Sequence, residues 1–125
     1  MLLKNILIGV NNYENFEYRL SQFLESFYYD VDIREEIVKE EPLTYGDYLM
    51  NGIIAAVVEE LCYRYKVEIP SWVLKKEFSG FDYPVIYNPL GVDFSKETII
   101  LYYLNSPVSF IIRNIFVSSQ FLIRF

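Results

Sequence analysis

The sequence contains no histidine and a single cysteine, Cys62. Without histidine, a serine–histidine or cysteine–histidine catalytic pair cannot form, and neither can a zinc site with imidazole ligands. One cysteine cannot make an internal disulfide or a cage of thiolates. Cys62 ends the apolar run 53–62, so we expect a reduced thiol in the protein core. These absences exclude the familiar nucleophilic and zinc chemistries.

Phosphate-binding motifs are also missing. The 125 residues include only 5 glycines, and no glycine-rich loop is found among them. Ser71 and Lys75 are one residue too far apart for a Ser-x-x-Lys motif. Phosphoryl chemistry of the familiar kinds is therefore not expected, and we predict no cofactor.

Long apolar runs are lacking as well. The run 53–62 is much shorter than the roughly 20 residues that a transmembrane helix needs, and Glu59 and Glu60 interrupt it. The first residues have an apolar stretch but no basic region followed by a small-residue cleavage site. We therefore expect a cytoplasmic protein that makes no contact with a membrane.

Aromatic residues, by contrast, are abundant, with 12 Tyr, 10 Phe and 1 Trp making up 18% of the chain. One explanation is codon bias in an AT-rich genome, which enriches Phe and Tyr without regard to function. The other is a partner surface, because aromatic rings contribute large buried areas to protein interfaces. Composition does not separate the two explanations.

The net charge of -6 is unevenly distributed. Residues 1–62 carry four basic and twelve acidic side chains, a charge of -8, whereas residues 63–125 carry seven basic and five acidic ones, a charge of +2. An acidic chain is a poor ligand for phosphate backbones, so direct nucleic-acid binding is not expected. The acidic half is compatible with a basic protein partner, and equally with solubility alone.

The apolar periodicity predicts helices over most of the chain. Asn11 and Asn12 precede an amphipathic helix through Phe27, and Asp32 with Glu35 resembles a capping box for a short helix that Pro42 ends. A third helix, from about residue 45 to 65 with Thr44 as its cap, is apolar nearly all round in its middle, which predicts a central buried element.

The second half has shorter predicted elements. A turn or short helix follows Pro70, and an irregular, aromatic-rich connection spans 78–92 with Phe81, Tyr83 and Tyr87 expected against the core. Ser95 caps a predicted helix to about Leu104. Ser106-Pro107 has the form of a cap followed by proline at the first helical position, and 114–117 is a short extended segment. We predict an all-α fold, a compact bundle of about five to six helices in one domain, 1–125.

Carboxylates are the chemically versatile groups left. The densest cluster consists of Asp30, Asp32, Glu35 and Glu36, which lacks the spacing of a calcium loop and is typical of a solvated helix face. Arg113 lies in an otherwise apolar stretch, so its charge must reach a carboxylate, carbonyl groups or water. A structural ion pair and a recognition contact both fit the sequence there, and Trp72 is either a core anchor or a binding residue.

The segment 106–117, together with Ile69-Pro70-Ser71-Trp72, resembles a group of small bacterial helical proteins. That group shares a Val/Ile-Pro-x-Trp step, a Ser-Pro-x-x-Phe-x-x-Arg-Asn-Ile-Phe segment and a final Leu-x-Arg, here Leu122-Ile123-Arg124. The connection 78–92 departs from the usual pattern. The residues that match the motif are Pro70, Trp72, Ser106, Pro107, Phe110, Arg113, Asn114 and Phe116, and all of them except Pro70 are our candidate interaction residues.

The resemblance implies an accessory protein of a two-gene system of the toxin and antitoxin kind, with a cognate partner that is often nucleotidyltransferase-like. It supplies no catalytic residues. Our leading hypothesis is therefore a non-catalytic interaction module, which is compatible with homo-oligomers. The alternatives are a small carboxylate-based or divalent-metal enzyme, and an acidic inhibitor that mimics DNA.

Overall fold

A computed structural model describes residues 2–44 and 46–122, and this part of the chain is mostly helical. Its α-helices are α1 (Tyr13–Tyr29), α2 (Arg34–Val38), α3 (Tyr48–Tyr65), α4 (Lys96–Asn105) and α5 (Val108–Ile111). Four 3-10 turns add to them: Leu3–Asn5, Val31–Ile33, Ser71–Leu74 and Lys76–Phe78. Two short strands, β1 (Val85–Ile86) and β2 (Ile115–Phe116), complete the described elements.

Helix α1 forms where the sequence predicts it. The side chain of Asn12 accepts a hydrogen bond from the backbone N–H of Asn15 at 2.8 Å and so satisfies one of the free donors of the first turn. The buried face consists of Phe16, Leu20, Phe23, Leu24 and Phe27. The three- and four-residue spacing of these side chains places them all on the side that packs into the core.

Helix α3 is the central element, as predicted, but it starts later. Its cap is Asp47, whose carboxylate accepts a hydrogen bond from the Met50 N–H at 2.7 Å, and not Thr44, which is exposed. The helix ends at Tyr65, and the next residue, Lys66, adopts a left-handed conformation with φ of 58°. Eleven of its eighteen residues are buried, including the whole run 50–58. This helix therefore supplies the middle of the core.

The predicted capping box before α2 is wrong. Neither Asp32 nor Glu35 caps the helix, which follows a 3-10 turn and ends at Val38, four residues before Pro42. Arg34 instead donates from Nε to the Phe27 carbonyl at 2.7 Å and from Nη2 to the Tyr28 carbonyl at 3.1 Å. Carbonyl groups in the last turn of a helix lack partners within the helix, so they can accept these bonds. Arg34 thereby fixes the start of α2 against the C-terminal end of α1.

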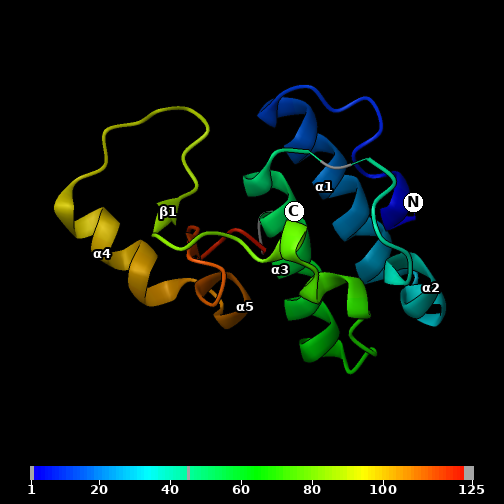
Figure 1. Ribbon diagram of the computed structural model, residues 1–125. Helices are drawn as coiled ribbons and strands as arrows, with labels where there is room; N and C mark the ends of the chain where they lie inside the picture. The colour runs from blue at the N-terminus through cyan, green and yellow to red at the C-terminus, as the bar shows by residue number, and fades with distance from the viewer. Residues whose placement is uncertain (1, 45, 123–125) are drawn as a thin grey trace.

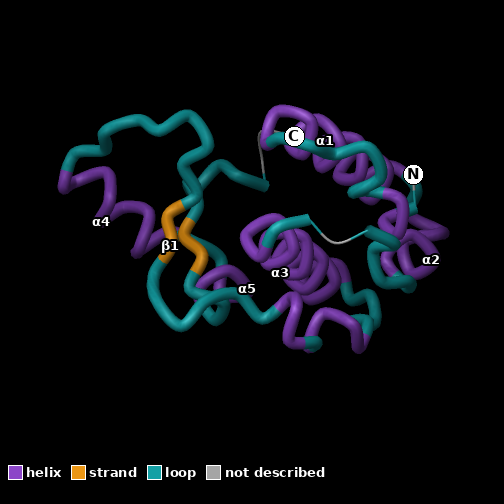
Figure 2. Tube along the Cα trace, turned by 45° about the horizontal axis from the view of Figure 1, so that its top comes forward, coloured by secondary structure: helices purple, strands orange, loops and turns teal. Residues whose placement is uncertain are grey.

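The prediction of an all-α fold needs one correction, since β1 and β2 pair in parallel, Val85 opposite Ile115 and Ile86 opposite Phe116. Parallel strands require a crossover, and the chain between them supplies it with α4 and α5. The sheet lies between the α3 region and α4 in Figure 2. Three aromatic residues of the connection 78–92 were expected against the core. Tyr87 is buried in the core and Phe81 packs against the core, but Tyr83 is exposed.

Helix α4 begins as predicted, with the Ser95 side chain accepting from the Thr98 N–H at 3.2 Å. Figure 1 shows it, in gold, standing to one side of the α1–α3 region, joined to it by the long connection from β1 and by α5. None of its residues is buried. The helix is thus only partly covered by the rest of the described chain.

Candidate functional site

The motif residues found in the sequence lie mainly inside the molecule. Trp72, Ser106, Phe110, Arg113 and Phe116 are buried, while Pro107 and Asn114 are half-buried. As a set they build the interior of the second half of the chain. The surface on which a partner would act must therefore be sought elsewhere.

Arg113 is the hub of that interior, with 3% of its surface exposed. Its guanidinium donates to the carbonyl oxygens of Phe78 at 2.9 Å, Ser109 at 2.8 Å and Val73 at 3.1 Å. Nη1 also donates to Glu59 Oε1 of α3 at 3.1 Å. Every terminal nitrogen is thus committed to an internal acceptor, which is the geometry of a structural ion pair and not of a recognition contact.

Two neighbours of Arg113 fix the backbone around it. Asn114 has φ of 58°, and its Nδ2 donates to the Phe81 carbonyl at 2.8 Å. Gly80 has φ of 83°, and a Cβ there would lie 2.1 Å from the Arg113 carbonyl oxygen, so only glycine fits. The connection 78–92 is therefore held tightly against the segment before β2.

Ser106 does not cap α5 as predicted, and Pro107 precedes the first helical residue instead of occupying it. The Ser106 hydroxyl donates to the Tyr102 carbonyl at 2.7 Å and accepts from the Val117 N–H at 2.9 Å. It thereby ties the end of α4 to the chain just after β2. This use of the hydroxyl depends on a residue eleven positions away, which helix-capping rules do not consider.

The remaining motif residues are aromatic anchors. Trp72 donates from Nε1 to the Val38 carbonyl at 3.1 Å and packs against Phe78, with ring centroids 4.9 Å apart. Phe110 packs edge-on to Phe121 at 5.6 Å. A buried indole with its N–H bonded is a core anchor, so the structure supports that interpretation of Trp72.

The cluster Asp30, Asp32, Glu35 and Glu36 is exposed to solvent. Among the residues that the structure describes, no group of three or more acidic or cysteine side chains lies close enough to hold a metal ion. The described residues therefore offer no gathered ligand set for the divalent-metal form of the enzyme hypothesis. In the same part of the chain, no helix has the length and apolar content needed to cross a bilayer.

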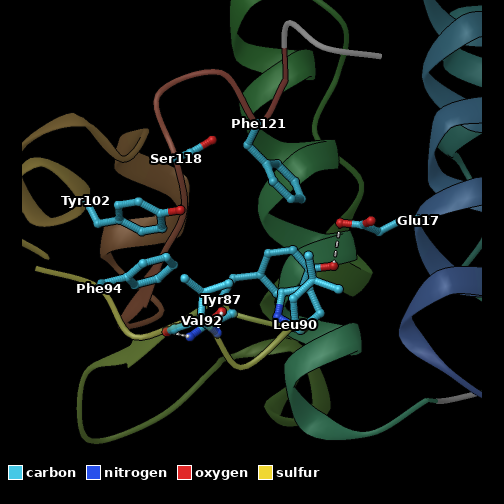
Figure 3. A pocket seen from close by; sticks show the side chains of 10 residues that line it. Glu17, Tyr87, Leu90, Val92, Phe94, Tyr102, Ser118 and Phe121 are labelled. Atoms are coloured by element: carbon cyan, nitrogen blue, oxygen red, sulfur yellow. Dashed lines mark hydrogen bonds between the residues drawn. The ribbon is translucent and has the colours of Figure 1, made fainter. Parts of the chain in front are cut away.

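A pocket of about 250 Å³ lies between α1, the connection after β1, α4 and the C-terminal segment. Figure 3 shows its side chains around a common space. We call it the aromatic pocket and define it by six of the residues that line it. They are Glu17, Tyr87, Phe94, Tyr102, Ser118 and Phe121.

The sheet positions the wall of this pocket. Tyr87 directly follows β1, and its N–H donates to the Phe116 carbonyl at 2.8 Å, which continues the parallel pairing. Its hydroxyl donates to Glu17 Oε1 of α1 at 2.8 Å. Its ring packs edge-on to Phe121, with centroids 5.5 Å apart. One tyrosine thus joins the sheet, α1 and the C-terminal segment.

The opposite side of the pocket is made by α4 and the residues just before it. The rings of Phe94 and Tyr102 pack at a centroid distance of 5.0 Å. The turn that leads there is held by Asn88, whose side chain donates to the Val92 carbonyl at 2.8 Å and accepts from the Val92 N–H at 3.1 Å. Sequence reasoning missed this pocket because Glu17 and Tyr87 are 70 residues apart, and only the aromatic content of 78–92 hinted at it.

A second feature is the outward side of α4. Ile100, Leu101 and Leu104 fall on one side of the helix by their spacing, and they are 48%, 55% and 72% exposed. We call these three residues the α4 face. Its other side holds the rings that fasten it, including Tyr103, which packs edge-on to Phe116 at 4.5 Å. An apolar stripe, which normally turns to the core, here turns to solvent.

The pKa values of two side chains, Tyr13 and Cys62, are strongly raised. Burial, together with the hydrogen bond from its hydroxyl to Asp47, raises the pKa of Tyr13 well above its usual value. Burial, with a smaller contribution from the Glu59 carboxylate, raises the pKa of Cys62 to about 12. The thiol is therefore a protonated, inert core group, as the sequence predicts.

Comparison with known proteins identifies no relative: no protein-family model, no curated protein and no solved structure matches this chain.

Proposed function

We propose that this chain is an accessory subunit that binds a protein partner through the α4 face. The observation that carries the proposal is a helix whose apolar stripe of Ile100, Leu101 and Leu104 faces solvent. Exposed apolar patches of this kind mark interaction surfaces, because leaving such side chains in water costs free energy that a partner recovers.

The charge of the chain favours a basic partner. The net charge is -6, and the acidic side chains of the first half that lie around α2, such as Glu35 and Glu36, are exposed. Complementary charge steers association and disfavours acidic competitors. A partner of basic overall charge that carries an apolar patch for α4 is therefore the best match. The finer form of the proposal, an antitoxin-like role beside a nucleotidyltransferase-like protein, derives from the sequence resemblance.

The test is the molar mass in solution, measured by light scattering, of the chain alone and mixed with the product of the adjacent gene. A stable complex of the two proteins is expected. The double variant Leu101→Glu with Leu104→Glu should weaken it at least about tenfold, since charges would enter an apolar contact. Circular dichroism of the variant should be unchanged because neither side chain is buried.

Leu74→Glu is the matched control. Leu74 is also an exposed leucine, 77% accessible, but it belongs to the 3-10 turn Ser71–Leu74 and not to α4. It should leave the complex intact. Two proteins that elute independently, a homodimer that excludes the second protein, or equal effects of the two kinds of variant would each overturn the proposal.

A further inference from the structure

We propose that the partner bound by the α4 face also places an apolar side chain, a leucine or a phenylalanine, in a hollow between α3 and α5. This inference rests on the proposed function and adds a second contact of the same partner. The hollow has a volume of about 390 Å³, and we call it the α5 hollow. It is lined by Glu59, Glu60, Tyr63, Ile69, Val108 and Ser109.

The α4 face by itself is too small for a stable protein interface. A specific interface takes about 20–30 residues and about 800 Å² of surface from each partner. The α4 face consists of three exposed apolar side chains, so the docking surface must continue beyond it. The next exposed aliphatic residues along the chain are Val108, Ile111 and Ile112, in α5 and directly after it.

Helix α5 keeps this continuation close to the α4 face. Only Ser106 and Pro107 separate the two helices. The Cα atoms of Leu104 and Val108 therefore lie at most about 14 Å apart. The Ser106 hydroxyl accepts a hydrogen bond from the Val117 N–H at 2.9 Å, which fixes the step between the helices. Figure 1 shows α5, in orange, between α4 and α3, so one partner can reach both the α4 face and the α5 hollow.

The wall of the α5 hollow is apolar. Tyr63 at the end of α3, Ile69 before Pro70 and Val108 at the start of α5 all line it, and all three are exposed. The volume lies within the usual range of binding pockets, roughly 300–1,000 Å³. An apolar side chain that fills such a hollow removes water from both surfaces, and anchors of this kind carry most of the energy of an interface.

The carboxylates of the hollow already have cationic partners. Glu59 Oε1 accepts from Arg113 Nη1 at 3.1 Å, and Glu60 Oε2 accepts from Arg64 Nε at 2.9 Å. A basic side chain that entered the hollow would lose water and would meet charges that are already balanced. The described lining therefore favours an apolar occupant over a basic one.

The first test needs no partner. It follows the backbone amide signals of the full chain by NMR during titration with three probes. N-acetyl-leucine amide and N-acetyl-phenylalanine amide represent apolar anchors, and N-acetyl-lysine amide represents a basic side chain. The signals of Tyr63, Ile69 and Ser109 should shift with an apolar probe and not with the lysine probe. No shift of these signals with either apolar probe, or an equal shift with the lysine probe, would overturn the assignment.

The second test uses the complex with the product of the adjacent gene and isothermal titration. Val108→Asn should weaken the complex at least about tenfold, because an amide would lie unpaired in an apolar contact. Val31→Asn is the matched control, since Val31 is an exposed valine outside the α5 hollow and α4. The two valines are 69% and 59% exposed, so neither variant should change the circular dichroism. Equal effects of the two variants would contradict the inference.

The remaining outcomes separate this inference from the proposed function. A complex weakened by the Leu101→Glu, Leu104→Glu variant and not by Val108→Asn would remove the α5 hollow and leave the α4 face as the docking site. Self-association that Val108→Asn abolishes would assign the hollow to a second copy of this chain, against a separate partner. No complex at all would overturn the proposed function, and the three probes alone would then decide what the hollow takes.

Discussion

Helices α3 and α4 are both rich in apolar residues, yet their environments are opposite. In α3, eleven of eighteen residues are buried, whereas in α4 none of ten is. Helix α3 contacts α5, β2 and the 3-10 turns after Pro70 and shares one core cluster with α1, while α4 is held by a few ring contacts and one serine hydroxyl. Apolar composition alone therefore does not decide whether this chain buries a helix.

The largest expected effect tests how α3 is joined to the second half of the chain. Arg113→Ala should lower the free energy of unfolding by about 3–5 kcal/mol, because it leaves a partly buried Glu59 carboxylate and three carbonyl groups without their donor. Urea unfolding followed by circular dichroism measures it. The control Arg64→Ala removes the exposed partner of a helical i,i+4 pair with Glu60 and should cost about 0.3–0.5 kcal/mol. Similar losses in both variants would contradict a structural role for Arg113.

The second prediction compares the two helices directly. Ile54→Ala in α3 should lower the free energy of unfolding by about 2–5 kcal/mol, because the side chain is fully buried and its removal leaves a cavity. Leu101→Ala in α4 should change it by less than about 0.5 kcal/mol. Both are measured by urea unfolding of the isolated chain. If Leu101→Ala is as costly as Ile54→Ala, α4 is covered in solution and the contrast fails.

The third prediction concerns the two helix caps. Asp47→Ala should cost about 1–2 kcal/mol of global stability, because it removes the cap of α3 and the acceptor of the Tyr13 hydroxyl, 2.8 Å away. Ser95→Ala removes the cap of α4, which should fray locally and leave global stability nearly unchanged. Amide hydrogen exchange separates the two outcomes. Faster exchange throughout the chain in Ser95→Ala would show that α4 unfolds together with the rest of the chain.

The smallest expected effect is a pH dependence of the free energy of unfolding that arises from Tyr13 of α1. Since the pKa of Tyr13 is raised in the folded chain above its unfolded value of 10.0, the folded state keeps a proton that the unfolded state loses. The contribution of Tyr13 to stability is therefore fully present below about pH 10 and is lost as the pH rises further. Tyr13→Phe should flatten this loss by less than about 1 kcal/mol.

The free energy of unfolding is compared at about pH 9 and about pH 11 in wild type and in both tyrosine variants. Tyr103→Phe is the matched control, because it removes a hydroxyl from α4 and leaves the Tyr13–Asp47 contact intact. An identical alkaline slope in wild type and Tyr13→Phe would contradict the assignment.

Local signals in the sequence predicted most of the helices. Asn12 and Ser95 cap α1 and α4 as expected, because a cap is made within three residues of itself. The same rules failed at Thr44, Asp32 and Ser106. Asp47 caps α3 in place of Thr44, the start of α2 has no side-chain cap, and Ser106 binds the chain after β2.

The sequence by itself determined a mostly helical chain with a central buried helix, an inert thiol and no histidine-based chemistry, since these follow from residue types and short-range periodicity. Only the tertiary structure decided that Arg113 is internal, that β1 pairs with β2, that the α4 face is uncovered and that Glu17 meets Tyr87. The physical reason is separation along the chain: these contacts join residues 30 to 70 positions apart, and their energies depend on packing that no local pattern records.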